Sequence, residues 1–323
     1  MRRFVFALAA LVAAFAGGTA AAQGVARTEI YAIDTVTLKA GQILTGDKSG
    51  VAARLGGELR IPKLGTDKLP AVILIHGSNG VGMNVSAWAQ ELNSLGVATF
   101  VLDSFTGRGI VDTLSDQSQL DSIAMVVDSY NALSLLAKHP RIDPQRIAVM
   151  GFSKGAVPAV YTSNQRFRKL YGRPDVAFAA HIGLYTPCNT QYRDDDKVTG
   201  APIRLFHGIA DDYVSIIPCR DYVARLKQAG ADATLTEYPD AFHAYDTTAL
   251  ARPIELPHAQ TTRNCFLKEG DSGQIINAKT GAAFSLQDAC VEHGPHVGYN
   301  AAATEATVKA VREFLSATFK LKS

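Results

Sequence analysis

Residues 146–155 read Arg-Ile-Ala-Val-Met-Gly-Phe-Ser-Lys-Gly, an apolar run that leads directly into a Gly-x-Ser-x-Gly motif. The run is typical of a strand buried on both faces of a sheet, and the residues after Lys154 are typical of a helix. In a tight turn from strand to helix, flanking glycines remove clashes and let a serine expose its hydroxyl above the sheet. Ser153 is therefore predicted to be a nucleophile, with an ordinary turn serine as the alternative.

The same alternation of strands and helices continues on both sides of this motif. Strands are expected at 71–75, 97–102, 146–150, 176–182, 203–206 and 233–238, after an antiparallel opening region over 29–62. Helices are expected at 84–95, 119–139, after 154, at 217–228 and at 302–319. The predicted fold class is α/β, with a mostly parallel central sheet and helices on both faces. Residues 23–323 are expected to form a single domain, and 252–300, with a hairpin turn at 277–281, form an excursion from it.

A serine hydroxyl is weakly nucleophilic, so this interpretation needs a base and an acid that orients the base. Asp211 and Asp212 follow one predicted strand, and His243 follows the next. The carboxyl ends of parallel strands share one edge of the sheet, so these side chains are expected near Ser153. Asp211 is favoured as the acid over Asp212 because it lies three residues after Gly208. His243 is the predicted base.

Acyl transfer to a serine also requires N–H groups that stabilise the developing oxyanion. One candidate is the main-chain N–H of Lys154, and the second is that of Ser78 in the glycine-containing loop 76–80. The alternatives are a loop that only connects a strand to a helix, or one that binds phosphate. The loop matches neither a P-loop nor a dinucleotide-binding fingerprint, which favours the oxyanion interpretation.

Taken together, these segments resemble the dienelactone hydrolase family of α/β-hydrolases. The resemblance covers about residues 70–246 and rests on His76-Gly77, 151–155, 208–211, 219–222 and 238–243. It implies an α/β-hydrolase fold and hydrolysis of an ester or lactone through Ser153, Asp211 and His243. Members that open dienelactone typically use a cysteine nucleophile and an acidic residue in the first loop. Here those places hold Ser153 and Gly77, so a serine esterase is predicted.

The predicted substrate is a small-molecule ester or lactone, and the chemistry requires no metal or organic cofactor. The family places an arginine in this part of the chain to hold a substrate carboxylate, which makes Arg108 a candidate. The alternatives for Arg108 are a structural salt bridge and a solvated loop arginine. Tyr185 and Tyr213 are candidates to line the acyl pocket, with packing as the alternative. Other functions stay open on the same fold: a peptidase, an acetyl or feruloyl polysaccharide esterase, or a binding protein without turnover.

The N-terminal 22 residues are predicted to be a secretory signal peptide, because two arginines precede an apolar run and three alanines. A membrane anchor is the alternative, but the run is shorter than the ~20 residues of a spanning helix. The formal charge of the whole chain is +2. The predicted signal holds two of its 32 basic residues and no acidic one, so the remaining 301 residues are balanced at 30 of each sign. Neither charge suggests binding to nucleic acid.

Export would expose the four cysteines to an oxidising compartment, where disulfides are the default. Proximity in the sequence favours the pairs Cys188–Cys219 and Cys265–Cys290. A metal site at Cys290, His293 and His296 is the alternative, although the spacing is not a familiar zinc spacing. The predicted protein is thus periplasmic or secreted and, after cleavage of the signal, not membrane-bound.

Overall fold

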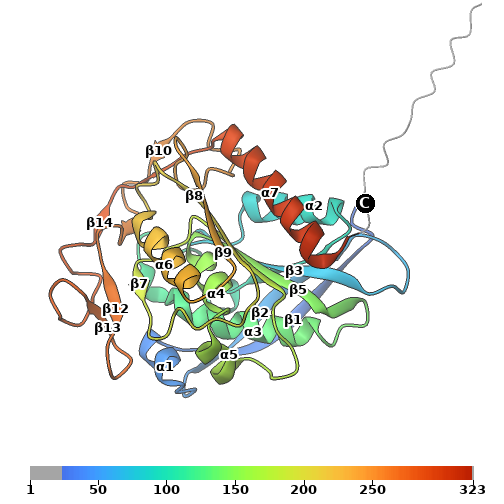
Figure 1. The fold of residues 1–323 in the computed structure, drawn as a ribbon, viewed down its shortest axis with the longest axis horizontal. Coiled ribbons are helices and arrows are strands. Elements are labelled where there is room, and N and C mark those ends of the chain that lie inside the picture. Colours follow the sequence, from blue (N-terminus) through green and yellow to red (C-terminus); the bar gives the residue numbers. More distant parts are fainter. Residues whose placement is uncertain (1–23, 322–323) are drawn as a thin grey trace, which may run out of the picture.

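The computed structural model describes residues 24–321, so the predicted signal peptide lies outside it. A central eight-stranded sheet has the order β1-β2-β4-β3-β5-β6-β8-β9 (Figure 1). Neighbouring strands from β4 onward are parallel, whereas β1 and β2 are antiparallel to their neighbours, which confirms the predicted mostly parallel sheet. The strands are β1 (Arg27–Thr37), β2 (Val51–Ile61), β3 (Leu69–Ile75), β4 (Ala98–Asp103), β5 (Ile142–Phe152), β6 (Ala180–Leu184), β8 (Ile203–Gly208) and β9 (Ala233–Tyr238).

Helices cover both faces of this sheet, as predicted (Figure 1). Helices α2 (Met83–Ser94) and α7 (Ala301–Phe319) pack on one face, where they meet Val72 and Leu74 of β3. The other face, with Ile73 and Ile75 of β3, is covered by α3 (Met125–Leu136), α4 (Ala156–Tyr161), α5 (Gln165–Tyr171) and α6 (Ile217–Gln228). The short helix α1 (Ala40–Thr45) links β1 to β2. Successive side chains of a strand point to opposite faces, so β3 is apolar throughout because both faces are covered.

Two predicted elements differ from the structure. The long helix expected over 119–139 is wrong at its start, because Leu120 has an extended backbone (φ −150°, ψ 118°) and α3 begins only at Met125. The preceding residues form two separate 3-10 turns, Gln117–Gln119 and Ser122–Ala124. The strand expected over 176–182 is displaced, since pairing with β5 begins only at Ala180.

The excursion over residues 252–300 forms short strand pairs beside α6 and β7, in orange in Figure 1. Its pairs are β10 (Ile254–Glu255) with β15 (His296–Val297), β11 (Gln260–Thr261) with β14 (Glu292–His293), and β12 (Leu267–Glu269) with β13 (Ile275–Asn277). Strand β12 also pairs with β7 (Thr190–Gln191), which joins the excursion to the loop after β6. The expected turn at 277–281 is present, with the Asn277 N–H donating to the Ala282 carbonyl across it.

One disulfide lies inside the excursion, and another lies outside it, joining the loop after β6 to α6. Disulfides join Cys188 to Cys219 and Cys265 to Cys290, the pairs that proximity in the sequence predicts. The second bond holds Cys290, so that residue is not a free metal ligand. Within residues 24–321, no three His, Cys, Asp or Glu side chains are grouped so that they could hold a metal ion. In the same range, no helix combines the length and the apolar character that crossing a membrane requires.

Candidate active site

Ser153 lies at a sharp turn between β5 and α4. Its φ of 51° is in the left-handed region, which costs a non-glycine residue roughly 1–2 kcal/mol. The turn requires glycine on both sides. A Cβ on Gly151 would lie 2.0 Å from the Gly155 carbonyl oxygen, and one on Gly155 would lie 2.3 Å from the main-chain oxygens of Ile75 and His76. Positions 151 and 155 of the motif are therefore glycine because the surrounding main chain leaves no room for a side chain there.

Ser153, His243 and Asp211 form a continuous hydrogen-bonded chain. The distance from Ser153 Oγ to His243 Nε2 is 2.9 Å, and that from His243 Nδ1 to an Asp211 carboxylate oxygen is 2.8 Å. A carboxylate can only accept, so His243 donates from Nδ1 and its Nε2 accepts from the serine hydroxyl. The structure thus brings together three residues that the sequence separates by up to 90 positions.

The Asp211 carboxylate is fully paired inside the protein. Its other oxygen accepts the main-chain N–H groups of Tyr213 and Val214 at 2.9 and 2.8 Å, and His207 lies 3.3 Å from the oxygen that faces His243. Burial by itself would raise the pKa of Asp211, but the charges and hydrogen bonds of His243 and His207 outweigh burial and hold that pKa well below its ordinary value. Asp211 is therefore ionised at neutral pH and can stabilise a positive charge on His243.

Asp212, the alternative acid, faces the excursion instead. Its two carboxylate oxygens accept from the main-chain N–H and from Nδ1 of His296, at 2.7 and 2.8 Å. Arg263 lies 3.5 Å from the same carboxylate. Asp211 therefore contacts His243 while Asp212 contacts His296, because the side chains of these consecutive residues point in different directions.

The loop 76–80 lies against the serine turn. A Cβ on Gly77 would come within 3.3 Å of the Ser153 Cβ. His76 is fully buried, and its Nε2 accepts the Ser104 N–H at 3.1 Å, which ties this loop to the end of β4. Burial lowers the pKa of His76, so the ring is neutral at pH 7. Ser78 therefore lies beside Ser153, where the oxyanion interpretation requires it.

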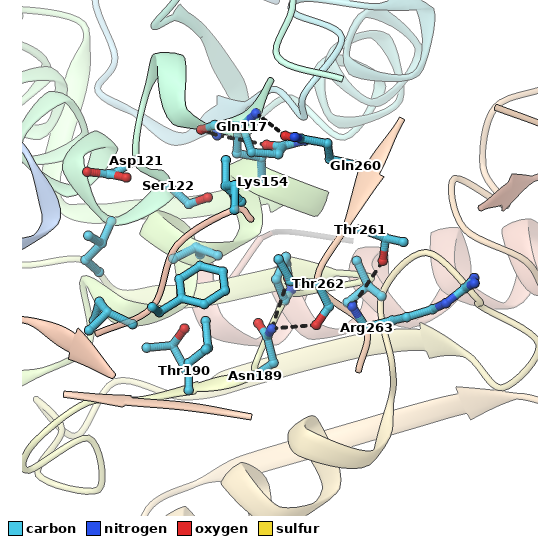
Figure 2. Close-up of a pocket in the computed structure, with 18 of the residues that line it drawn as sticks. Gln117, Asp121, Ser122, Lys154, Asn189, Thr190, Gln260, Thr261, Thr262 and Arg263 are labelled. Carbon is cyan, nitrogen blue, oxygen red and sulfur yellow. Dashed lines mark hydrogen bonds between the residues drawn. The ribbon is translucent and has the colours of Figure 1, made fainter. Parts of the chain in front are cut away.

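Ser153 lines a cavity of about 360 Å³. Figure 2 shows side chains around this cavity, among them Gln117, Lys154 and Thr262. Strand ends and loops of the sheet supply one wall, which includes Ser78, Lys154 and Tyr213. The excursion supplies the other wall, which includes Gln260, Thr262 and Phe284. The sequence leaves open whether the excursion shapes the mouth of a pocket, because nothing in its composition indicates where it folds back. The volume is suited to a small molecule.

Lys154 extends into this cavity and is 3% exposed. Burial lowers its pKa to about 8, against a weaker opposing effect of Asp121 and Asp116. Its Nζ donates to the side-chain oxygen of Gln117 at 3.0 Å and approaches the main-chain oxygen of the same residue at 3.4 Å. A buried lysine held by neutral oxygens is costly, which indicates a role in the site.

The three predicted substrate-binding residues have different positions. Tyr213 lines the cavity, and its ring centroid lies 4.7 Å from that of His243. Tyr185 packs its ring against His243 at 4.6 Å, but its hydroxyl donates to buried Asp246 at 2.8 Å and does not line the cavity. Arg108 also lies outside the cavity, so the structure does not support its predicted role.

The N–H groups of the Arg108 guanidinium donate to other groups of the protein. It forms a bidentate pair with buried Asp128 at 2.8 and 2.9 Å and donates further to Thr37 and to the Ser104 carbonyl. The fifth N–H of the guanidinium points to the Val36 carbonyl at 3.5 Å, so no donor is left for a substrate carboxylate. The salt bridge that the sequence left as the alternative is the arrangement present, and it ties β1 to α3 and the loop after β4.

The strand order, the strained serine turn and the acid and histidine at the ends of β8 and β9 define an α/β-hydrolase. The profile of the dienelactone hydrolase family matches residues 55–319. The chain belongs to the dienelactone hydrolase family, and this membership makes it a carboxylic ester hydrolase.

Individual relatives are distant. "Polyketide transferase ATR5" of Stachybotrys chlorohalonatus is 32% identical over 92 residues, which cover 27% of this chain and 29% of that protein. A "Probable 2-oxo-3-(5-oxofuran-2-ylidene)propanoate lactonase" of Bradyrhizobium sp is 23% identical over 209 residues, covering 58% of this chain and 80% of the relative.

Two solved structures share the fold. A dienelactone hydrolase-like promiscuous phosphotriesterase from metagenomic libraries superposes with a TM-score of 0.55 at 14% identity, covering 90% of this chain and 98% of its own. A protein named m3DLH gives a TM-score of 0.56 at 17% identity, covering 92% and 99%. At these identities the likeness concerns the fold alone.

Proposed function

We propose that the protein hydrolyses carboxylic esters or lactones through Ser153, with His243 as base and Asp211 as the acid that orients it. The observation that carries this proposal is the continuous chain from Ser153 Oγ through His243 to Asp211, at 2.9 and 2.8 Å. Such distances match the geometry that serine activation requires.

In the proposed reaction, His243 Nε2 takes the hydroxyl proton as Ser153 Oγ attacks the carbonyl carbon. The negative charge that forms on the carbonyl oxygen is bound by the main-chain N–H groups of Ser78 and Lys154. His243 then gives its proton to the departing alkoxide, which leaves an acyl-enzyme. Water repeats these steps and releases the acid. In a lactone both products stay on one molecule.

We further propose that the protein acts after export. This rests on the N-terminal sequence, whose arginines, apolar run and small residues are typical of a signal peptide. The two disulfides support it, because such bonds persist in oxidising compartments.

The test is a panel of short acyl esters, small lactones and acetylated or feruloylated sugars, assayed with wild type and Ser153→Ala. We expect hydrolysis of at least one ester or lactone by wild type and a loss of about 10⁴-fold or more in the variant. Hydrolysis confined to peptides, or equal activity in both proteins, would overturn the proposal.

A further inference from the structure

Gln117 contacts both residues whose main-chain N–H groups are proposed to bind the oxyanion, Ser78 and Lys154. Figure 2 shows Gln117 beside Lys154 and Gln260. Its Nε2 donates to Ser78 Oγ at 3.1 Å, and its Oε1 accepts from Lys154 Nζ at 3.0 Å. An ammonium group can only donate, so the amide oxygen must face Lys154 and the amide nitrogen is left for Ser78. One side chain thus bridges the two segments.

The residues just before Gln117 hold Ser78 from a second side. The Thr113 N–H donates to the Ser78 carbonyl at 2.7 Å, and the Thr113 hydroxyl donates to Gln117 Oε1 at 3.3 Å. Thr113 is fully buried. Segment 113–117 therefore fixes Ser78 through both its carbonyl and its hydroxyl, while the Ser78 N–H takes no part in either bond.

The same residue is bound to the excursion. The Gln117 N–H donates to Gln260 Oε1 at 2.9 Å, and the Gln260 N–H donates to the Leu114 carbonyl at 2.8 Å. Gln260 belongs to β11 and lines the same cavity as Ser153. Hydrogen bonds thus run from the excursion through Gln117 to both halves of the oxyanion site.

We propose that Gln117 is a positioning residue that sets the separation of the two oxyanion-binding N–H groups and couples it to the excursion. This inference rests on the proposed function. The two N–H groups come from different segments, the loop after β3 and the turn after β5. Pairing of β3 with β5 places these segments side by side, and the bridge between their side chains adds a second constraint on the spacing of the two N–H groups. Loss of one such donor costs about 10²–10³-fold in kcat elsewhere, and a loosened pair should cost part of that.

The test compares Gln117→Met with Gln119→Met. Methionine keeps the length of the side chain and removes its hydrogen bonds. Gln119 lies in the same turn, but its amide donates only to the carbonyls of Asp112 and Asp116. We expect Gln117→Met to lower kcat by about 10- to 100-fold with KM within about twofold, and Gln119→Met to stay within about twofold of wild type in both constants.

Inhibition by a trifluoromethyl ketone distinguishes a positioning role of Gln117 from a purely structural one. Serine adds to the ketone carbonyl and forms a bound oxyanion, so the inhibition constant should weaken in Gln117→Met by the same factor as kcat/KM. Gln260→Met should lower kcat by a smaller factor, and the effects of the two changes should be less than additive, because Gln260 binds the same segment that carries the Gln117 side chain.

Several outcomes would overturn the inference while leaving the proposed function intact: kcat unchanged in Gln117→Met, a loss that falls on KM alone, or an equal loss in Gln119→Met. If Gln117→Met does not fold, Ser78→Ala replaces it, since that change removes the partner of Gln117 and keeps the main-chain N–H. An unchanged kcat in Ser78→Ala would then reject the bridge. Failure of the proposed function looks different, because wild type itself would hydrolyse no ester.

Discussion

The two walls of the cavity are built in different ways. On the sheet side, Ser153, Asp211 and His243 follow the ends of strands whose register fixes where each turn begins. On the excursion side, the strands are two or three residues long and are held by side chains. Buried Glu269 accepts from Arg166 and Arg193, and Asp212 accepts from His296. The catalytic candidates thus lie on the wall formed by the sheet. The shape of the cavity also depends on the excursion, which is held by its own side-chain contacts.

The adjacent aspartates give the sharpest test of this division. Asp211→Asn should lower kcat by about 10⁴-fold, because the amide no longer favours the productive tautomer of His243. Asp212→Asn should keep most of the activity and lower the free energy of unfolding instead, since it weakens the bonds to His296. Steady-state kinetics and urea unfolding of both variants measure this. A larger loss of kcat in Asp212→Asn would reverse the assignment.

Removal of the disulfide inside the excursion tests whether the excursion unfolds independently of the sheet. Cys265 and Cys290 close a loop of 25 residues, so the paired change to serine should cost about 3 kcal/mol of stability. We expect limited proteolysis to cut first within 265–290, at denaturant concentrations where the sheet is still folded. First cleavage within the strands of the sheet would show instead that the two regions unfold together.

Lys154 lines the cavity and is buried. Its burial should affect how the free energy of unfolding depends on pH. Its pKa is lowered to about 8 in the folded protein, from 10.5. The folded state therefore bears the full cost of the buried charge below pH 8, and this cost fades between pH 8 and 10.5 as the folded protein loses the proton first. Lys154→Met should raise the free energy of unfolding by up to about 3 kcal/mol at pH 7.

Urea unfolding of wild type and Lys154→Met at pH 7 and pH 10.5 measures this difference. The advantage of the variant should be largest at pH 7 and should vanish near pH 10.5. An advantage independent of pH would contradict the burial argument.

The smallest effects are expected at the two tyrosines beside His243. Tyr185→Phe leaves buried Asp246 with the Trp88 indole N–H as its remaining side-chain donor, which should cost about 1–2 kcal/mol. The Tyr213 hydroxyl is buried and has no hydrogen-bond partner within residues 24–321. Tyr213→Phe should therefore leave stability unchanged or raise it by about 1 kcal/mol. Thermal unfolding measures whether each variant is less or more stable than wild type. An equal loss of stability in Tyr185→Phe and Tyr213→Phe would contradict these expectations.

Much of the sheet wall could be predicted from the sequence, because buried strands leave continuous apolar runs and the turns after them carry recognisable residues. Ser153, Asp211 and His243 each follow such a run. The start of α3 could not be predicted. Leu120 and Ile123 lie at helical spacing with the later apolar residues, but Asp121 between them accepts the Ala40 N–H from a distant segment. Arg108 was misjudged for a related reason. Its partner Asp128 lies on α3, and nothing local indicates that pairing.

The excursion wall and Gln117 could not be found from the sequence. The contacts that place them join residues up to 143 positions apart, as between Gln117 and Gln260, and they are formed by amides that occur on any surface. The two disulfides are the exception, because oxidised cysteines pair in a small number of ways. They fix the ends of the loops but say nothing about which side chains line the cavity.

The most direct test of the central claim is labelling with a fluorophosphonate, followed by intact mass and peptide mapping. Activated serine attacks phosphorus and expels fluoride, so wild type should gain one phosphonyl group per chain, on the peptide that contains Ser153. Ser153→Ala should gain none under the same conditions, and His243→Ala should react far more slowly. Labelling of Ser153→Ala at the wild-type rate would contradict the account.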